Sequence, residues 1–272
     1  MLSVLVTAGA VSACGHLVDP PLPPSTSQFF APVVYTRWWA MTQACSGQSG
    51  SLGSVSWFET TDTLKDPRSG AVIDGYWSAA TNRIVLSAKM KLDGGTVRHE
   101  MLHALLRQGG HSRAQFLGQC AGVVTCTTAC VEDAGPAPPT DPASIEVLPE
   151  SLTVGIAVEP AAPSAANDEG FFTMTVTARN PSSHPVTVLL PLPARPARTF
   201  AFDITGPGGR TIDGVIQLDP SANTFAAGET KQQVFDFVIG QQPLARVLPP
   251  GNYTIVGSYG GRATPPISLV LQ

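Results

Sequence analysis

The first half of the chain mixes two hydrophobic periods, which predicts both helices and strands. Within Pro32–Cys45 the apolar residues Val34, Trp38 and Met41 recur at helical spacing, so we expect a helix there. Short apolar runs bounded by turn residues predict three strands, at Val55–Glu59, Ala71–Trp77 and Arg83–Ala88. The segment Ser78–Asn82 has the composition of a hairpin loop between the last two strands.

A second helix is predicted directly after these strands. The segment Asp93–Thr96 combines turn residues with residues that cap helices, and apolar positions follow it to about Arg107 or Gln108. Gly109 and Gly110 come next, and glycine adopts positive φ easily just past a helix end. We therefore expect the helix to end at this glycine pair.

The second half of the chain predicts strands only. Runs that alternate apolar with polar or small residues are separated by Gly, Pro and Asn; they are Ser151–Val158, Phe171–Arg179, Val186–Leu190, Thr199–Thr205, Gln233–Val238 and Asn252–Tyr259. Strands at this spacing favour an antiparallel β-sandwich of immunoglobulin-like type over residues 145–272. A stretch of Pro, Ala, Asp and Gly at 131–144 predicts a linker before it.

Composition fits a folded protein rich in strands and turns. The 272 residues are 43% hydrophobic and 13% charged, with 26 Gly and 25 Pro. A disordered chain carries more charge and less apolar content. The net charge of -4 provides no basic surface for nucleic acid, which needs clustered Lys and Arg.

The amino terminus has the pattern of an export signal. Residues 1–13 are uncharged and apolar or small, and the run is too short to span a bilayer. The tetrapeptide Val11–Cys14 resembles a bacterial lipobox, which implies cleavage before Cys14 and a lipid on that residue. Residues 14–28 are rich in proline and predict an extended tether. We expect a lipoprotein anchored to the bacterial cell envelope.

Four further cysteines fit an exported protein. Cys45, Cys120, Cys126 and Cys130 all precede the linker, and an even number suggests two disulfides. Four cysteines allow three pairings; Cys126 and Cys130 could close a small loop, which would leave Cys45 with Cys120. A zinc site made of cysteines is the weaker interpretation, because the chain has no CxxC pair.

The segment His99-Glu100-Met101-Leu102-His103 carries the chemistry. On a helix, His99 and His103 lie on one face about one turn apart, where both imidazoles can reach one Zn2+. Glu100 is displaced by one residue, so its carboxylate can act on a zinc-activated water without binding the metal. The predicted cofactor is therefore one catalytic Zn2+, with Glu100 as general base.

The run Arg98–Leu106 (RHEMLHALL) resembles the active-site helix of the zincin metallopeptidases. The resemblance implies an α+β zincin-like domain over 29–130, followed by the all-β sandwich. It further implies that the preceding strand, Arg83–Ala88, is the sheet edge that pairs with extended substrate backbone. Arg98, beside the motif, we interpret as solvated or salt-bridged.

The third metal ligand stays open among several residues. His111 is the first candidate, because it follows the helix and could fold back to the metal. The spacing departs from the metzincin pattern HExxHxxGxxH, and no Met-turn methionine lies between Met101 and Met174. Zincins of other groups use a downstream Glu or Asp, for which Glu132 and Asp133 are the candidates. Tyr76 is a candidate oxyanion donor.

These features together predict a cell-envelope zinc metallopeptidase that hydrolyses peptide bonds in a peptide or protein substrate. The alternative is a non-catalytic surface lipoprotein with a zincin-like fold, whose sandwich binds a partner or the cell wall. A site closed by four protein ligands would favour that alternative, whereas catalysis needs an open position. Hydrolysis of a non-peptide amide, for example in cell-wall material, is a third hypothesis.

Overall fold

The computed structural model describes residues 19–66, 70–136, 144–166, 168–189, 200–209, 211–216, 223–240 and 247–272. Within these ranges the protein consists mostly of β-strands with few helices. The predicted lipidation site Cys14 and the predicted signal segment 1–13 lie outside the described residues. No helix in the described ranges is long and apolar enough to cross a membrane.

The first half of the chain folds as one small sheet with helices on one face. Its elements are β1 (Ser27–Phe29), α1 (Val34–Ser46), β2 (Ser56–Thr60), β3 (Gly75–Ser78), β4 (Arg83–Ser87), α2 (Gly94–Leu106) and α3 (Thr128–Asp133). The strand order is β1-β2-β4-β3, in which only the β2–β4 pair is parallel. The predicted α1 is confirmed, and each predicted strand appears within a few residues of its expected bounds.

The second half of the chain contains strands in two main layers. One layer has the order β13-β12-β7-β6, and the other has β10-β9-β14-β15 with β16 paired to β14. Three short strands, β11-β8-β5, form a smaller sheet. The bounds are β5 (Ile145–Val147), β6 (Thr153–Glu159), β7 (Phe171–Arg179), β8 (Val186–Val188), β9 (Phe200–Thr205), β10 (Thr211–Ile216), β11 (Thr224–Phe225), β12 (Thr230–Ile239), β13 (Val247–Leu248), β14 (Gly251–Tyr259), β15 (Arg262–Ala263) and β16 (Ile267–Leu271).

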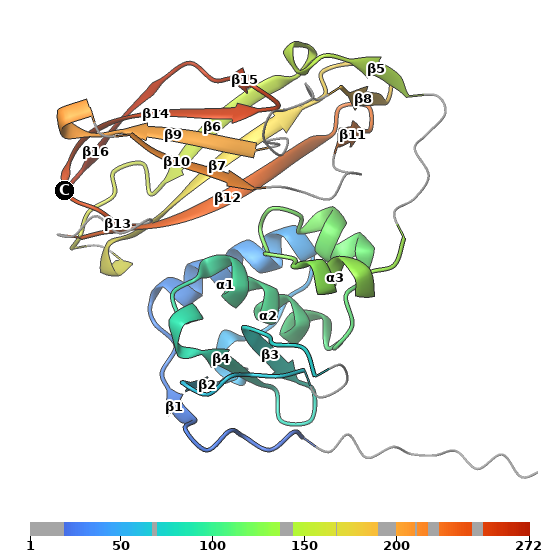
Figure 1. Cartoon of the computed structure of the whole chain (residues 1–272), viewed down its shortest axis with the longest axis vertical. Coiled ribbons are helices and arrows are strands. Elements are labelled where there is room, and N and C mark those ends of the chain that lie inside the picture. Colours follow the sequence, from blue (N-terminus) through green and yellow to red (C-terminus); the bar gives the residue numbers. More distant parts are fainter. Residues whose placement is uncertain are drawn as a thin grey trace, which may run out of the picture.

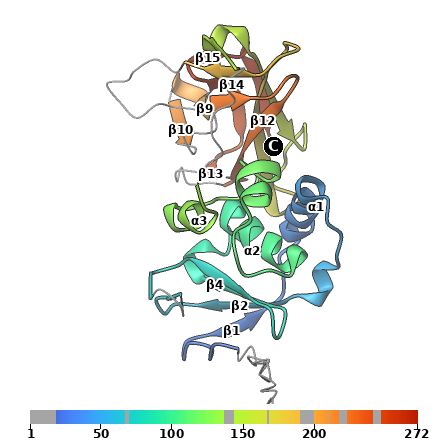
Figure 2. The same cartoon turned by 90° about the vertical axis from the view of Figure 1, so that its right-hand side faces the viewer.

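The two halves pack against each other. Figures 1 and 2 show α1 and α2 between the four-stranded sheet and the layer that contains β7 and β12. Phe171 of β7 belongs to the same buried cluster as Trp38 of α1, and the two rings meet edge to face at 5.9 Å. Val238 of β12 packs on that cluster too. The core of the first half is therefore completed by residues of the second.

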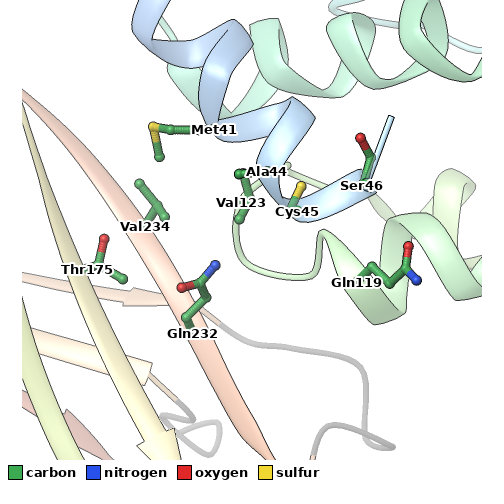
Figure 3. Close-up of a pocket in the computed structure, with 10 residues that line it drawn as sticks. Met41, Ala44, Cys45, Ser46, Gln119, Val123, Thr175, Gln232 and Val234 are labelled. Atoms are coloured by element: carbon green, nitrogen blue, oxygen red, sulfur yellow. The ribbon is translucent and has the colours of Figure 1, made fainter. Parts of the chain in front are cut away.

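A cavity of about 600 Å³ opens along the same boundary (Figure 3). Met41 and Cys45 of α1 line one side, and Gln232 and Val234 of β12 line the other. Val123, from the loop before α3, completes the wall between them. This loop is therefore in contact with both halves of the protein.

Three expectations from the sequence need correction. The tether predicted at 14–28 is in part folded, since Asp19 contacts Ser78, Thr81 and Arg83, and Ser27 already pairs with β2. The linker predicted at 131–144 begins later, because α3 runs to residue 133. Strand β4 is internal, so the edge of the sheet beside α2 is β3.

Sharing a core should couple the stability of the two halves. We expect Phe171→Ala to lower the free energy of unfolding by about 3 kcal/mol, because it empties space next to Trp38. All four tryptophans lie in the first half, at positions 38, 39, 57 and 77. Tryptophan fluorescence during urea unfolding therefore reports on the first half, although the substitution lies in the second.

The matched control is Val270→Ala on β16, where the side chain is 51% exposed and the change should stay within about 0.5 kcal/mol. An unchanged fluorescence midpoint in Phe171→Ala would contradict a shared core. So would two separate transitions when fluorescence is compared with far-ultraviolet circular dichroism.

Candidate metal centre

Helix α2, which carries His99, Glu100 and His103, starts and ends through local interactions. The Asp93 carboxylate accepts a hydrogen bond from the Thr96 N–H at 2.9 Å, as a side-chain cap does. At the other end Arg107, and neither Gly109 nor Gly110, takes the left-handed conformation, with φ of 55°. The chain reverses two residues before the predicted glycine pair, which lets His111 return to the face that carries His99 and His103.

Three imidazole nitrogens converge at the end of this turn. The Nε2 atoms of His99 and His111 are 3.1 Å apart, those of His99 and His103 are 3.2 Å apart, and those of His103 and His111 are 3.3 Å apart. Ligands at 2.0–2.1 Å from a tetrahedral Zn2+ would be separated by about 3.3 Å. The three histidines therefore have the spacing of ligands on one metal ion, and the structure brings His111 into the site as predicted.

The second nitrogen of each ring fixes which tautomer is present. Nδ1 of His99 lies 2.8 Å from the Thr125 carbonyl oxygen, and Nδ1 of His103 lies 2.7 Å from that of Gln108. Nδ1 of His111 lies 2.8 Å from a carboxylate oxygen of Asp133. These oxygens only accept hydrogen bonds, so each Nδ1 carries a proton, and in a neutral ring the Nε2 atom then presents a lone pair.

Three lone pairs that face each other at about 3 Å repel unless a cation lies between them. Burial lowers the pKa of His99 well below its usual range, and the neighbouring His103 and His111 lower it further. Burial lowers the pKa of His103 to about 4, with a further contribution from His111. Both rings are therefore neutral near pH 7, the state in which imidazole binds metal.

Phe116 is a component of the site that the sequence analysis missed. Its fully buried ring lies 5.0, 4.7 and 4.9 Å from the ring centroids of His99, His103 and His111 respectively. It belongs to a short π-helix, Ala114–Gln119. Such a segment has no reliable sequence signature, and its only signal was a lone aromatic residue shortly after His111. The ring gives the three imidazoles a rigid apolar wall.

Glu100 lies on the side of α2 that faces the sheet edge. A methyl group on Gly75 of β3 would come within 3.2 Å of the Glu100 Cγ atom, so the carboxylate side chain fills the space that this glycine leaves. Glu100 is 5% exposed. Burial raises its pKa to about 8, and a hydrogen bond from the Trp77 backbone opposes that rise.

The other candidate residues from the sequence lie at different distances from the three histidines and have different roles. Asp133 orients His111 through its Nδ1 and its backbone N–H, and Glu132 is exposed on the same helix. Tyr76 follows Gly75 in β3, so its side chain points to the opposite face of the sheet from Glu100. Its nearest charged groups there are Arg83 and Asp19. The structure thus does not bring Tyr76 to the metal centre.

The predicted disulfides are both present. Cys45–Cys120 joins α1 to the end of the π-helix, and Cys126–Cys130 joins the residue after Thr125 to α3. The bonds therefore hold the segments that carry Phe116, Thr125 and Asp133. The zinc site made of cysteines, the weaker interpretation, is excluded by this pairing.

Comparisons with known proteins do not name a family. No family model and no curated protein matches the chain. Among solved structures, the chain is similar to the alkylpurine DNA glycosylase AlkC of Pseudomonas fluorescens, with a TM-score of 0.32 and 12% identity over 45% of this chain and 30% of that one. An immunoglobulin-like protein from Pseudomonas aeruginosa matches with a TM-score of 0.25 and 11% identity, over 50% of this chain and 100% of that one. Similarities this low identify neither fold nor function.

The role of Asp133 predicts that substitutions of Asp133 and of its neighbour Glu132 affect Zn2+ binding differently. Asp133→Asn should weaken Zn2+ binding about 10- to 100-fold, because an amide no longer fixes His111 in the metal-binding tautomer. Glu132→Gln, on the same short helix, should bind Zn2+ like the wild type. Competition with a chelator of known affinity measures both constants. A larger loss in Glu132→Gln would show that Glu132 is the ligand.

The buried carboxyl group predicts a pH dependence of stability in the metal-free protein. A pKa raised from 4.5 to about 8 means that the folded state holds a proton that the unfolded state releases. The stabilisation is complete below about pH 4.5 and is lost as the pH rises through about 8. Glu100→Gln should remove this loss, so its melting temperature should fall less between pH 6 and pH 8.5. Identical slopes in the two proteins would contradict a buried, protonated Glu100.

Proposed function

We propose that the protein is a zinc-dependent peptidase of zincin type. The observation that carries this proposal is the convergence of three unprotonated imidazole nitrogens beside a buried carboxyl group. Among the residues that the structure describes, no fourth His, Cys, Asp or Glu atom joins the three histidines. A site with three protein ligands keeps a position for water or substrate, as catalytic zinc sites do.

His99, His103 and His111 would hold the ion through Nε2. Bound Zn2+ supplies Lewis acidity and lowers the pKa of a coordinated water from 15.7 to about 7. Within this chain, Thr125, Gln108 and Asp133 keep the three imidazoles in the binding tautomer. Phe116 prevents the rings from rotating away.

Glu100 would take and return the proton. General acid–base catalysis works best when the pKa of the group lies near the working pH. In the metal-free protein burial raises the pKa of Glu100 to about 8, and the charge of a bound Zn2+ would lower it towards neutrality, where a carboxyl group can accept a proton and later give it to a leaving amine. The carboxyl group therefore serves both steps of amide hydrolysis.

Strand β3 would hold the substrate. It is the outermost strand of its sheet, and its Gly75 contacts Glu100, so this edge lies next to the catalytic carboxyl group. An extended peptide that adds to this edge forms backbone hydrogen bonds with it. That arrangement favours a peptide over other amides, since it recognises a polypeptide main chain.

The alternative of a non-catalytic lipoprotein is less well supported. A structural site has no use for Glu100, whose burial is unfavourable for a carboxylate. We also propose that the protein is exported and anchored through Cys14. The two disulfides support export, because such bonds persist in oxidising compartments.

Replacing Glu100 should separate Zn2+ binding from peptide hydrolysis. Glu100→Gln should retain one Zn2+ per chain and lose about 10²- to 10⁴-fold in the rate of cleavage of fluorescein-labelled casein. Glu132→Gln, an exposed acid near the site, should keep wild-type activity. Equal activity in wild type and Glu100→Gln would exclude this mechanism. A wild-type protein that holds zinc and releases fragments only from purified peptidoglycan would favour the non-peptide amide.

A further inference from the structure

We infer that the β-sandwich is a positioning element of the metal centre, acting through Asp236 and Arg98 on the segment that orients His99. The inference rests on the proposed metal site and does not depend on peptidase activity. It gives the sandwich, which the sequence places after a linker, a direct part in the metal centre. The relevant contacts lie where β12 meets α2 and the loop Gly122–Thr125.

A buried ion pair joins β12 to the metal-binding helix. Nη1 and Nη2 of Arg98 each lie 2.9 Å from one carboxylate oxygen of Asp236, which is a two-point contact. Arg98 is 1% exposed and Asp236 is 6% exposed. Arg98 immediately precedes the ligand His99, so the pair fixes α2 at the position where the metal binds. Breaking it would leave an unpaired charge in the interior.

The same arginine holds the loop. Its Nε donates to the Val123 carbonyl oxygen at 2.6 Å. Two residues further on, the Thr125 N–H donates to Gly95 in the first turn of α2 at 3.1 Å, and the Thr125 carbonyl accepts from Nδ1 of His99 at 2.8 Å. Arg98 thus connects Asp236 to the loop that sets the tautomer of His99.

Strand β12 also contacts this loop directly. The Val234 N–H donates to the Gly122 carbonyl at 2.8 Å, and Nε2 of Gln233 donates to the same oxygen at 3.1 Å. Gly122 has φ of +74°, and a methyl group there would overlap the Gln232 carbonyl. Only glycine permits so close an approach. Val123 and Val234 lie across the same boundary in Figure 3.

These contacts form one continuous path from the sandwich to a metal ligand. It runs from Asp236 and Gln233 through Arg98 and the loop to the Thr125 carbonyl, and from there to His99. Partners that orient metal-binding histidines typically contribute 10- to 100-fold to metal affinity. Disturbing the β12 end of the path should therefore weaken the metal site without touching any ligand.

The test measures Zn2+ affinity of the full chain by chelator competition, together with the visible spectrum of the Co2+-loaded protein. Asp236→Asn should bind Zn2+ at least about 10-fold more weakly and alter the Co2+ spectrum. Gln233→Met, which removes the bond to Gly122 and keeps the side-chain volume, should have a smaller effect in the same direction. If Asp236→Asn fails to fold, Gln233→Met decides the question.

The matched control is Leu269→Ala in the sandwich core on β16, in the layer away from α2. It should lower the melting temperature and leave both metal readouts unchanged. If it weakens Zn2+ binding as much as Asp236→Asn, the effect is general destabilisation and the inference is wrong. Wild-type affinity in Asp236→Asn or, where that variant does not fold, in Gln233→Met overturns it too. A wild-type chain that binds neither metal overturns the metal centre itself, and this inference with it.

Discussion

The site depends on the three hydrogen bonds that keep every imidazole protonated at Nδ1. Without them, each ring could place its proton on Nε2, and the converging nitrogens would form ordinary hydrogen bonds with each other. With them, three lone pairs face one point, and a cation is the natural group to occupy it. The acceptors come from three separate segments, at Thr125, Gln108 and Asp133, so the metal site requires most of the first half to be folded.

Burial shifts the pKa values of the histidines and of Glu100 in opposite directions. It lowers the pKa values of His99 and His103 and raises that of Glu100, so these two rings are neutral and lie near a protonated acid in the metal-free protein. His103 and Glu100 have thus given up favourable hydration of their charged forms. A structure that serves only stability gains little from this arrangement, whereas a site that exchanges protons requires it.

Local patterns in the sequence were sufficient to predict part of this structure. The spacing of His99 and His103 is a property of one helix, and the helical period of α1 needs no tertiary information. The cysteine count allowed three disulfide pairings, and the structure has the one that loop size suggested. The place of His111 in the site could also be predicted, because this residue lies close to the end of the helix.

The remaining features depend on contacts between distant segments. Asp133 was a candidate ligand from the sequence, but its contact with His111 depends on the fold of the chain after α2, and so does the contact of Phe116 with the three histidines. The edge strand was misplaced because strand order is decided by pairing rather than by sequence order. Arg98 was ambiguous for the same reason: its partner Asp236 lies 138 residues away.

The loop Gly122–Thr125 shows why the first half of the chain uses both disulfides and contacts with the β-sandwich. A first half of about 100 residues buries a limited core, and exported proteins of this size commonly add disulfides. Cys120 and Cys126 flank the loop and fix both its ends covalently. Between them, Gly122 is held by β12 and Val123 by Arg98. Because Thr125 presents its carbonyl to His99, the loop needs restraint at its middle as well as at its ends, and β12 supplies part of that restraint through Gly122.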